Sequence, residues 1–277
     1  MSILRNILYI YIIFGLIVSC KKKHEIEICS YEHTDSLVFK ERNSESYINL
    51  ISSIRLSQLE THSEDLSEQR IVKNINNFII NELSNTHKEK INPDSIVNQL
   101  YSDNMSELLM NLREKELIDE DAKATSPHPN KELEISDTLY NRIYADCHFG
   151  LGDTILCVRI SSSVYTGGAH PGKTTYCYSF SLNDGGKIKG NRIVPRDQTT
   201  VLLSRIKHRL MEMKHFQSEE ELESNGFREI IISPYLLLDK DSLTFFYESY
   251  SIAPFCEGDI EVKFSYKELE DISLLNK

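Results

Sequence analysis

The sequence predicts an α+β fold in which helices pack on one face of antiparallel sheets. Strands are predicted at residues 154–165, 175–182 and 260–266, where apolar and polar residues alternate. Helices are predicted at residues 71–112 (two of them) and 197–214, where apolar residues recur at helical spacing. Strands, helices, strands, a helix and strands follow one another along the chain, an order typical of helices that cover one face of an antiparallel sheet.

The region before the first helix contains short β-like pieces, spread over residues 24–60, with no helical period. Thr61 and Glu64 have the spacing of a capping box, which predicts the start of the first helix. The second helix is predicted to open at Asn92-Pro93, a cap residue followed by a proline suited to the first helical position.

The remaining elements follow from composition and alternation. The polar stretch 117–135 has two prolines and no period, which predicts a loop. The alternating strands at 154–165 and 175–182 each have one apolar face, so we expect a sheet that is open on one side. Strands are also expected over 228–250, and the chain closes with a short helix at 267–273.

The first 19 residues predict a lipoprotein signal peptide. Their apolar run, residues 7–18, has the length of a secretory signal and is too short for a membrane helix, which needs about 20 residues. The run ends in Ile-Val-Ser-Cys, which resembles a bacterial lipobox with Cys20 as the acylated mature N-terminus. A short membrane anchor or a buried strand is the alternative.

Lipidation at Cys20 implies stable attachment to a membrane of the cell envelope. Lys21 follows the cysteine, and under the usual aspartate-based sorting rule it does not retain a lipoprotein in the inner membrane. We therefore expect an outer-membrane site if the cell has an outer membrane. The periplasmic or surface side stays open.

The charge of the chain restricts its partners. The net charge is −11, and residues 1–19 contain one charged residue, Arg5, so the mature chain has a net charge of −12. An acidic chain of this kind predicts no nucleic-acid partner and favours a basic protein or a cationic ligand. The alternative is that the charge only keeps the protein soluble.

The cysteine pattern predicts neither a metal site nor a cofactor. Five cysteines follow Cys20, and their spacings match no metal-binding motif. Up to two disulfides could form in an oxidising envelope, but a Cys157–Cys177 bridge is not expected. If Tyr165 pairs with Thr175 across the hairpin, these two thiols lie too far apart. The five residues are Cys29, Cys147, Cys157, Cys177 and Cys256.

The stretch YTGGAHP, residues 165–171, joins the two predicted central strands. Gly167 and Gly168 allow positive φ in a turn, and Pro171 delays pairing of the returning strand. The stretch is therefore interpreted as a hairpin connection that borders a binding surface, with Tyr165 and His170 as its candidate contact residues.

His170 is also the best candidate for a reactive group. Catalysis would require a hydroxyl nucleophile or an orienting carboxylate, and Glu257 and Asp259 are candidates if their loop meets this one. No nucleophile elbow, zinc-protease helix or phosphate-binding loop accompanies His170. We therefore expect no enzyme, with a His170-dependent enzyme as the alternative.

A second candidate loop is SIAPFCEG, residues 251–258. Pro254 and Gly258 shape its backbone. Phe255 is either a plug in the core or, with Tyr250, an aromatic anchor of the kind that dominates protein interfaces.

These two loops carry a family resemblance. YTGGAHP, followed by SLTFFYESYSIAPFCEGDIEVKFSYKEL, resembles the extracellular part of the RsiV-type, lysozyme-sensing anti-sigma factors. Ser265 stands where that family usually has proline. The family's cytosolic sigma-binding segment and transmembrane helix have no counterpart in this sequence, so an anti-sigma role is not expected.

A second resemblance concerns residues 45–168, which look like the accessory domain of PdaC-type peptidoglycan deacetylases. Deacetylase chemistry belongs to a separate catalytic domain that the sequence does not contain. The signal sequence and the two resemblances together divide the chain into residues 1–19 (signal peptide), 20–44 (anchor and linker, or first strand), 45–168 (PdaC-accessory-like) and 169–277 (RsiV C-terminal-like).

Together these observations predict an envelope lipoprotein whose ectodomain binds a protein or a cell-wall ligand. A lysozyme-like muramidase or peptidoglycan is the partner that the resemblance implies. The alternatives are an envelope polysaccharide-modifying enzyme that uses His170 and a structural partner of an outer-membrane assembly. The candidate binding residues are Tyr165, Gly167, Gly168, His170, Pro171, Tyr250, Pro254 and Phe255.

Overall fold

The structure is a computed structural model that describes residues 25–84, 92–125 and 133–274. The predicted signal peptide, Cys20 and part of the predicted loop 117–135 lie outside the described residues. In the part of the chain that is described, no helix combines the length and apolar character needed to cross a membrane.

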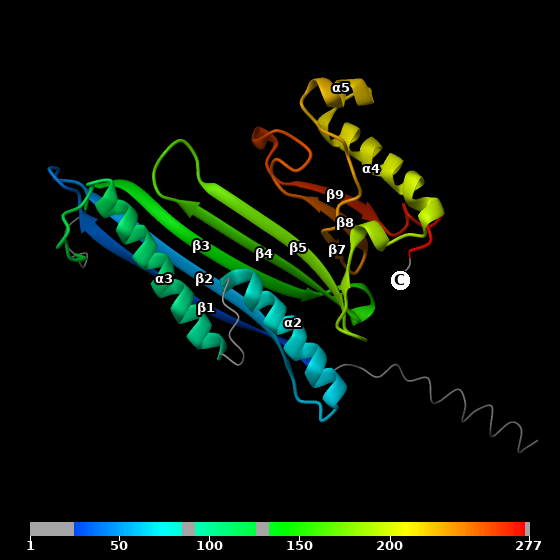
Figure 1. Cartoon of the computed structure of the whole chain (residues 1–277), viewed down its shortest axis with the longest axis horizontal. Helices are drawn as coiled ribbons and strands as arrows, with labels where there is room; N and C mark the ends of the chain where they lie inside the picture. Colours follow the sequence, from blue (N-terminus) through cyan, green and yellow to red (C-terminus); the bar gives the residue numbers. More distant parts are fainter. Residues whose placement is uncertain (1–24, 85–91, 126–132, 275–277) are drawn as a thin grey trace, which may run out of the picture.

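A six-stranded sheet with the strand order β1-β2-β3-β4-β5-β6 forms the body of the molecule (Figure 1). All neighbours are antiparallel except β2 and β3, which are parallel. Parallel neighbours need a crossover connection, and two helices supply it. The elements are β1 Ile26–Lys40, β2 Tyr47–Thr61, α2 Leu66–Ser84, α3 Pro93–Glu114, β3 Ile135–Phe149, β4 Ile155–Tyr165, β5 Gly172–Ser181 and β6 Lys187–Ile188.

The helices α2 and α3 cover one face of this sheet (Figure 1). Alternate residues of β4, such as Leu156 and Val158, point to the helices and share a core with Ile75 and Ile79 of α2. The other end of the sheet packs on α3, where Leu108 contributes to a second cluster. The predicted α+β class, with antiparallel sheets and helices on one face, is therefore confirmed.

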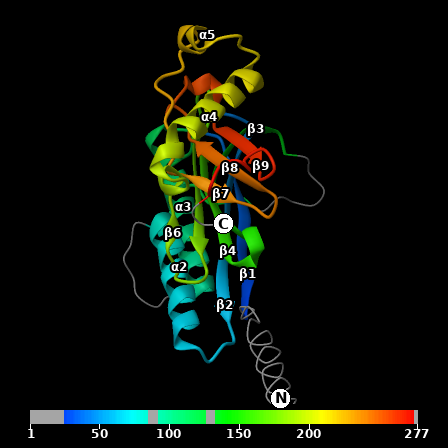
Figure 2. The same cartoon turned by 90° about the vertical axis from the view of Figure 1, so that its right-hand side faces the viewer.

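A smaller three-stranded sheet packs against the opposite face, at one end of the large sheet (Figures 1 and 2). Cys157 and Cys177 point to this side and are fully buried in its core. The expectation of an open face is thus wrong where the small sheet lies. Its elements are η2 Gly190–Arg192, η3 Arg196–Gln198, α4 Thr199–Lys214, α5 Glu219–Ser224, β7 Leu236–Leu238, β8 Ser242–Tyr247, η4 Phe255–Glu257 and β9 Ile260–Ser265; η1, Leu151–Asp153, joins β3 to β4.

The small sheet lies between α4 and the large sheet. Arg209 of α4 stacks over the ring of Phe264 on one face, and Arg159 of β4 reaches Phe246 on the other. Every residue of β8 is buried, as expected for a strand that is covered on both faces.

The two sheets approach so closely that a side chain would not fit at Gly150. A Cβ atom there would lie 2.0 Å from the carbonyl oxygen of Leu238 and 2.9 Å from Sγ of Cys157. Glycine at the end of β3 therefore permits the contact between the β3–β4 connection and the end of β7.

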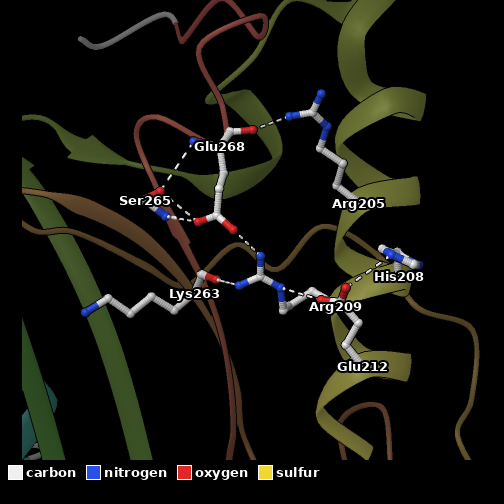
Figure 3. Close-up of polar contacts among 7 residues, drawn as sticks. All are labelled: Arg205, His208, Arg209, Glu212, Lys263, Ser265 and Glu268. Carbon is white, nitrogen blue, oxygen red and sulfur yellow. Dashed lines mark hydrogen bonds and ion pairs between the residues drawn. The ribbon is translucent and has the colours of Figure 1, made fainter. Parts of the chain in front are cut away.

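A cluster of charged residues fastens α4 to the C-terminal segment (Figure 3). Arg209 donates to the carbonyl oxygen of Lys263, at 2.7 Å, and to the carboxylate of Glu268. The second carboxylate oxygen of Glu268 accepts hydrogen bonds from the backbone N–H and the hydroxyl of Ser265, both at 2.8 Å. Arg205 donates to the backbone carbonyl of Glu268. The hydrogen bonds that Ser265 and Arg209 donate to the carboxylate lower the pKa of Glu268 to about 2.

Several predicted elements are wrong in extent or kind. The short β-like pieces predicted before the first helix are in fact two long strands, Ile26–Lys40 and Tyr47–Thr61, and only Leu236–Leu238 of the predicted strand at 228–238 is β. Thr61 still belongs to β2, and Asp65 caps α2 by accepting a hydrogen bond from the backbone N–H of Ser67, so the predicted capping box does not form. The segment 267–273 forms turns instead of a helix.

The predicted division between residues 45–168 and 169–277 stays a prediction. The boundary falls in the connection between β4 and β5, which pair along their length within the large sheet.

Candidate functional site

The two candidate loops contact each other. The β4–β5 connection carries His170, whose imidazole centroid lies 4.6 Å from the ring centroid of Phe255 in the β8–β9 connection. Phe255 in turn stacks on Tyr250, with centroids 5.2 Å apart and ring planes inclined by 27°. We call the three side chains Tyr250, Phe255 and His170 the aromatic ridge.

Tyr250 is the most unusual member of the ridge. Its side chain is 60% exposed, and its φ of +69° lies in the left-handed region, which bulky residues rarely adopt. Such a conformation costs about 1–3 kcal/mol and persists only when neighbouring contacts enforce it. Here Ser251 donates its backbone N–H to the carbonyl oxygen of Glu248, closing a turn around Tyr250. The backbone therefore bends in a way that presents the tyrosine ring to solvent.

Two ion pairs hold the Tyr250–Phe255 loop in place. Asp259 pairs with Lys173 of β5 at 2.9 Å and accepts hydrogen bonds from the backbone N–H and hydroxyl of Ser249. Burial raises the pKa of Asp259, but the bonds from Lys173 and Ser249 outweigh burial and leave it below its usual value. Glu257 pairs with Lys214 of α4 at 2.5 Å.

The predicted turn conformation of YTGGAHP is present. Gly167 and Gly168 have φ values of +86° and +126°. The hydroxyl of Tyr165 donates to the carbonyl oxygen of Gly168 at 3.0 Å, and Lys115, the C-cap residue after α3, donates to the carbonyl oxygen of Thr166. The connection is thus braced from both sides.

The structure does not bring together the acid, imidazole and hydroxyl considered for catalysis. Glu257 and Asp259 both bind lysines, and the hydroxyl of Tyr165 bonds to the backbone. Nδ1 of His170 lies 3.3 Å from the carbonyl oxygen of Pro171, and no described carboxylate pairs with this imidazole. The arrangement can offer ring surface to a partner, and it assembles no proton-transfer pair.

The eight predicted binding residues therefore fall into three groups. Tyr250, Phe255 and His170 form the ridge. Pro254 supports the ridge by packing near Gly226, where an added Cβ would lie 2.9 Å from the proline ring. Tyr165, Gly167, Gly168 and Pro171 shape the neighbouring connection, and the ring of Tyr165 faces Tyr140 of β3 at 5.9 Å.

A set of aromatic and basic side chains on the open part of the large sheet was not predicted from the sequence. Arg142 stacks over the ring of Tyr140 at 4.4 Å, and Arg55 stacks over Tyr144 at 4.7 Å while pairing with Asp146. The alternation of residues 140, 142 and 144 on one strand face was the available signal.

A small hollow also lies next to the ridge. Its volume is about 110 Å³, and its lining includes Tyr235, Glu248 and Ser251. Because Glu248 and Ser251 lie within two residues of Tyr250 in the chain, the hollow and the ridge belong to one surface region.

Three side chains with metal-ligand chemistry lie elsewhere, at the contact between the two sheets. They are His148 of β3, Cys157 of β4 and Asp239 after β7. Hydrogen bonds to Asp239 and Cys157 raise the pKa of His148 to about 10. All five described cysteines are free, so no disulfide forms, including the disfavoured Cys157–Cys177 pair. The hairpin register pairs Cys157 with Ser179, which differs from the predicted register.

Comparisons with known proteins identify a matching domain family for part of the chain. Residues 191–267 match a family model described as "Protein of unknown function (DUF3298)". No curated protein matches the chain. The matched segment runs from η2 through β9 and includes the Tyr250–Phe255 part of the ridge.

Two crystal structures are similar to the chain. A member of the DUF3298 family from Bacteroides fragilis NCTC 9343 has a TM-score of 0.64 at 23% identity, covering 91% of this chain and 95% of that one. A DUF3298 family protein from Pseudomonas aeruginosa PAO1 has a TM-score of 0.49 at 14% identity, covering 89% of this chain and 94% of that one. The first likeness shows a shared fold that extends well beyond the matched domain.

Proposed function

We propose that the chain is a bacterial envelope lipoprotein, anchored through Cys20 in the outer membrane, whose ectodomain binds a basic, lysozyme-like muramidase through the aromatic ridge. The observation that carries this proposal is the exposed Tyr250 ring, held at a strained backbone position and stacked on Phe255. Strain at a residue that contributes little to the core favours a role in recognition.

The chemistry of the ridge supports binding. Tyrosine is enriched at the centre of protein interfaces, because a large ring supplies contact area with few torsions to immobilise. The ridge combines a tyrosine, a phenylalanine and an imidazole from two loops, which gives a continuous ring surface.

The charge around the ridge supports a basic partner. Glu248 lies two residues before Tyr250. Burial, together with the negative charge of Asp259, raises the pKa of the Glu248 carboxyl group. No described cation forms an ion pair with Glu248, so a cationic group of a partner would relieve an unfavourable charge. The net charge of −11 also favours a basic partner, through long-range electrostatic attraction. The resemblance to the RsiV-type ectodomain implies a lysozyme in particular.

The alternatives rest on weaker support. An envelope polysaccharide-modifying enzyme would need a group that activates His170, and the two candidate acids, Glu257 and Asp259, form ion pairs with lysines. A structural partner of an outer-membrane assembly predicts a large exposed apolar patch. Among the described residues, the large exposed aliphatic side chains are instead spread over α2, α3, β3, α4 and the segment before β7, at Leu66, Met110, Ile135, Val201, Met213 and Ile231.

The test is direct binding of the full chain in detergent to a c-type lysozyme and, separately, to purified peptidoglycan, at low and at moderate salt. We expect saturable lysozyme binding that persists at moderate salt. Binding that disappears with salt would reflect charge attraction alone and would contradict the proposal. Binding to peptidoglycan without lysozyme binding would replace the proposed partner. Polysaccharide turnover that is lost in His170→Ala would establish the enzyme alternative.

A further inference from the structure

We propose that His148, Cys157 and Asp239 form a binding site for a single transition-metal ion of the Zn²⁺ class, which joins the large and the small sheet. This site is separate from the aromatic ridge, and the inference does not depend on the proposed function.

The three residues come from three elements and converge on one point. His148 and Cys157 are cross-strand partners in β3 and β4, so the register of the sheet places their side chains on the same face. Asp239 follows β7 of the small sheet, and its Oδ1 lies 2.6 Å from Nε2 of His148. One candidate ligand atom from each residue lies within 4.8 Å of the other two.

The set of donor atoms matches the preference of Zn²⁺. This ion is bound by thiolate, imidazole and carboxylate groups, in tetrahedral geometry with ligand atoms roughly 3.3–3.6 Å apart. An ion that replaced the proton between His148 and Asp239 would lengthen their 2.6 Å contact, and the separation of these two groups from the thiol, at most 4.8 Å, would shorten by up to about 1.2 Å as the imidazole and the carboxylate shift toward it. The required shifts are the size of side-chain adjustments.

The surroundings fix the thiol and leave one approach open. Sγ of Cys157 is fully buried and lies 3.3 Å from the carbonyl oxygen of Leu238, and Gly150 packs close on another side. The side chain of His148 is 51% exposed, so an ion and a water ligand can enter from its side. Three protein ligands with one accessible position are typical of a zinc site that retains a water.

Outer contacts hold the ligands in place. The hydroxyl of Tyr266 donates to the backbone carbonyl of Asp239 at 2.9 Å, which fixes the turn that carries the carboxylate. Contacts of this kind orient metal ligands and contribute to affinity.

The test is titration of the reduced, metal-free full chain with Zn²⁺ by equilibrium dialysis, and with Co²⁺ by absorption spectroscopy. We expect one ion per chain, a thiolate-to-Co²⁺ charge-transfer band and a higher melting temperature with Zn²⁺. Cys157→Ser should remove the band and weaken Zn²⁺ binding more than about tenfold. The matched control is Cys177→Ser, which changes a buried cysteine of the same sheet face and should keep both.

Because Cys157 is buried, its substitution could unfold the protein, so His148→Gln provides a second variant at an exposed position. It should also weaken Zn²⁺ binding more than about tenfold, whereas His208→Gln on α4 should not. Absence of Zn²⁺ binding to the wild-type chain would overturn the proposal. Binding that is unchanged in folded His148→Gln, or Co²⁺ binding without a thiolate band, would also overturn it.

Discussion

The imidazole of His170 packs on the ring of Phe255, with centroids 4.6 Å apart, although the two residues belong to connections of different sheets. The ridge therefore exists only because the small sheet docks on one face of the large one. Its geometry depends on the contacts at that junction, including those around Gly150 and Lys173.

Substitution of Tyr250 tests whether the backbone of this residue is strained. At its φ of +69°, glycine avoids the cost that a Cβ atom imposes, so Tyr250→Gly should be more stable than Tyr250→Ala by about 1 kcal/mol. The measurement is the free energy of unfolding in urea. At Ile231, an exposed position without positive φ, the order should reverse, with glycine less stable than alanine. Equal stabilities of the two Tyr250 variants would rule out the strain.

Substitution of Lys173 tests whether its ion pair with Asp259 stabilises the connection between β8 and β9 against β5. Its loss in Lys173→Met leaves the carboxylate of Asp259, whose side chain is only 9% exposed, without its cation. We expect a loss of about 1–3 kcal/mol in the free energy of unfolding, partly restored by adding Asp259→Asn. Lys240→Met is the control, because its pair with Asp153 is highly exposed and should contribute less than about 0.5 kcal/mol. Equal losses in Lys173→Met and Lys240→Met would contradict this account.

Substitution of Glu268 tests whether its carboxylate holds α4 against the C-terminal segment, because this contribution to stability should depend on pH. Its folded-state pKa of about 2 lies below the ordinary value of 4.5, so its contribution is present above that ordinary value and is lost as pH falls toward 2. Glu268→Gln should therefore be less stable than the wild type at neutral pH, by less than about 1 kcal/mol because the side chain is 45% exposed.

The difference between wild type and Glu268→Gln should disappear as pH approaches 2, measured by urea unfolding at several pH values. Glu270→Gln, which changes an exposed neighbour, is the matched control. A Glu268→Gln difference that stayed constant with pH would show that the carboxylate contacts contribute nothing.

Gly150 tests the close approach of the two sheets. Gly150→Ala places a Cβ atom 2.0 Å from a backbone carbonyl that cannot move without displacing β7. We expect destabilisation by about 2–3 kcal/mol, visible as a lower melting temperature. Gly172→Ala meets only an ordinary contact, 3.4 Å from Cγ1 of Val164, and should show no such loss.

The sequence was informative where strands are half-buried or helices amphipathic. The alternation in β4, β5 and β9 predicted those strands because the apolar face of each packs on a core, although the small sheet also covers the other face of β4 and β5 at one end. The strand β1 has no such period, since as an edge strand it is largely exposed, so its length was missed. The parallel pairing of β2 with β3 is non-local, and no local pattern indicates it.

The site was predictable in its parts but not in its assembly. The glycines, proline and aromatic residues of both loops were identified, yet their contact depends on how two sheets dock. The left-handed backbone at Tyr250 had no signal, because the residue type opposes it. His148 and Cys157 become neighbours only once the register of the β3–β4 hairpin is known, so their spacing in the chain suggested no metal site.

The most direct test of the central claim is the affinity of Phe255→Ala for a c-type lysozyme, compared with the wild type and with Met110→Ala. Phe255 joins the two outer members of the ridge, and Met110 is an exposed apolar residue on α3. The account predicts binding weaker by about 30-fold or more in folded Phe255→Ala, as for a residue at the centre of an interface, and unchanged binding in Met110→Ala. Equal affinities of all three proteins would contradict it.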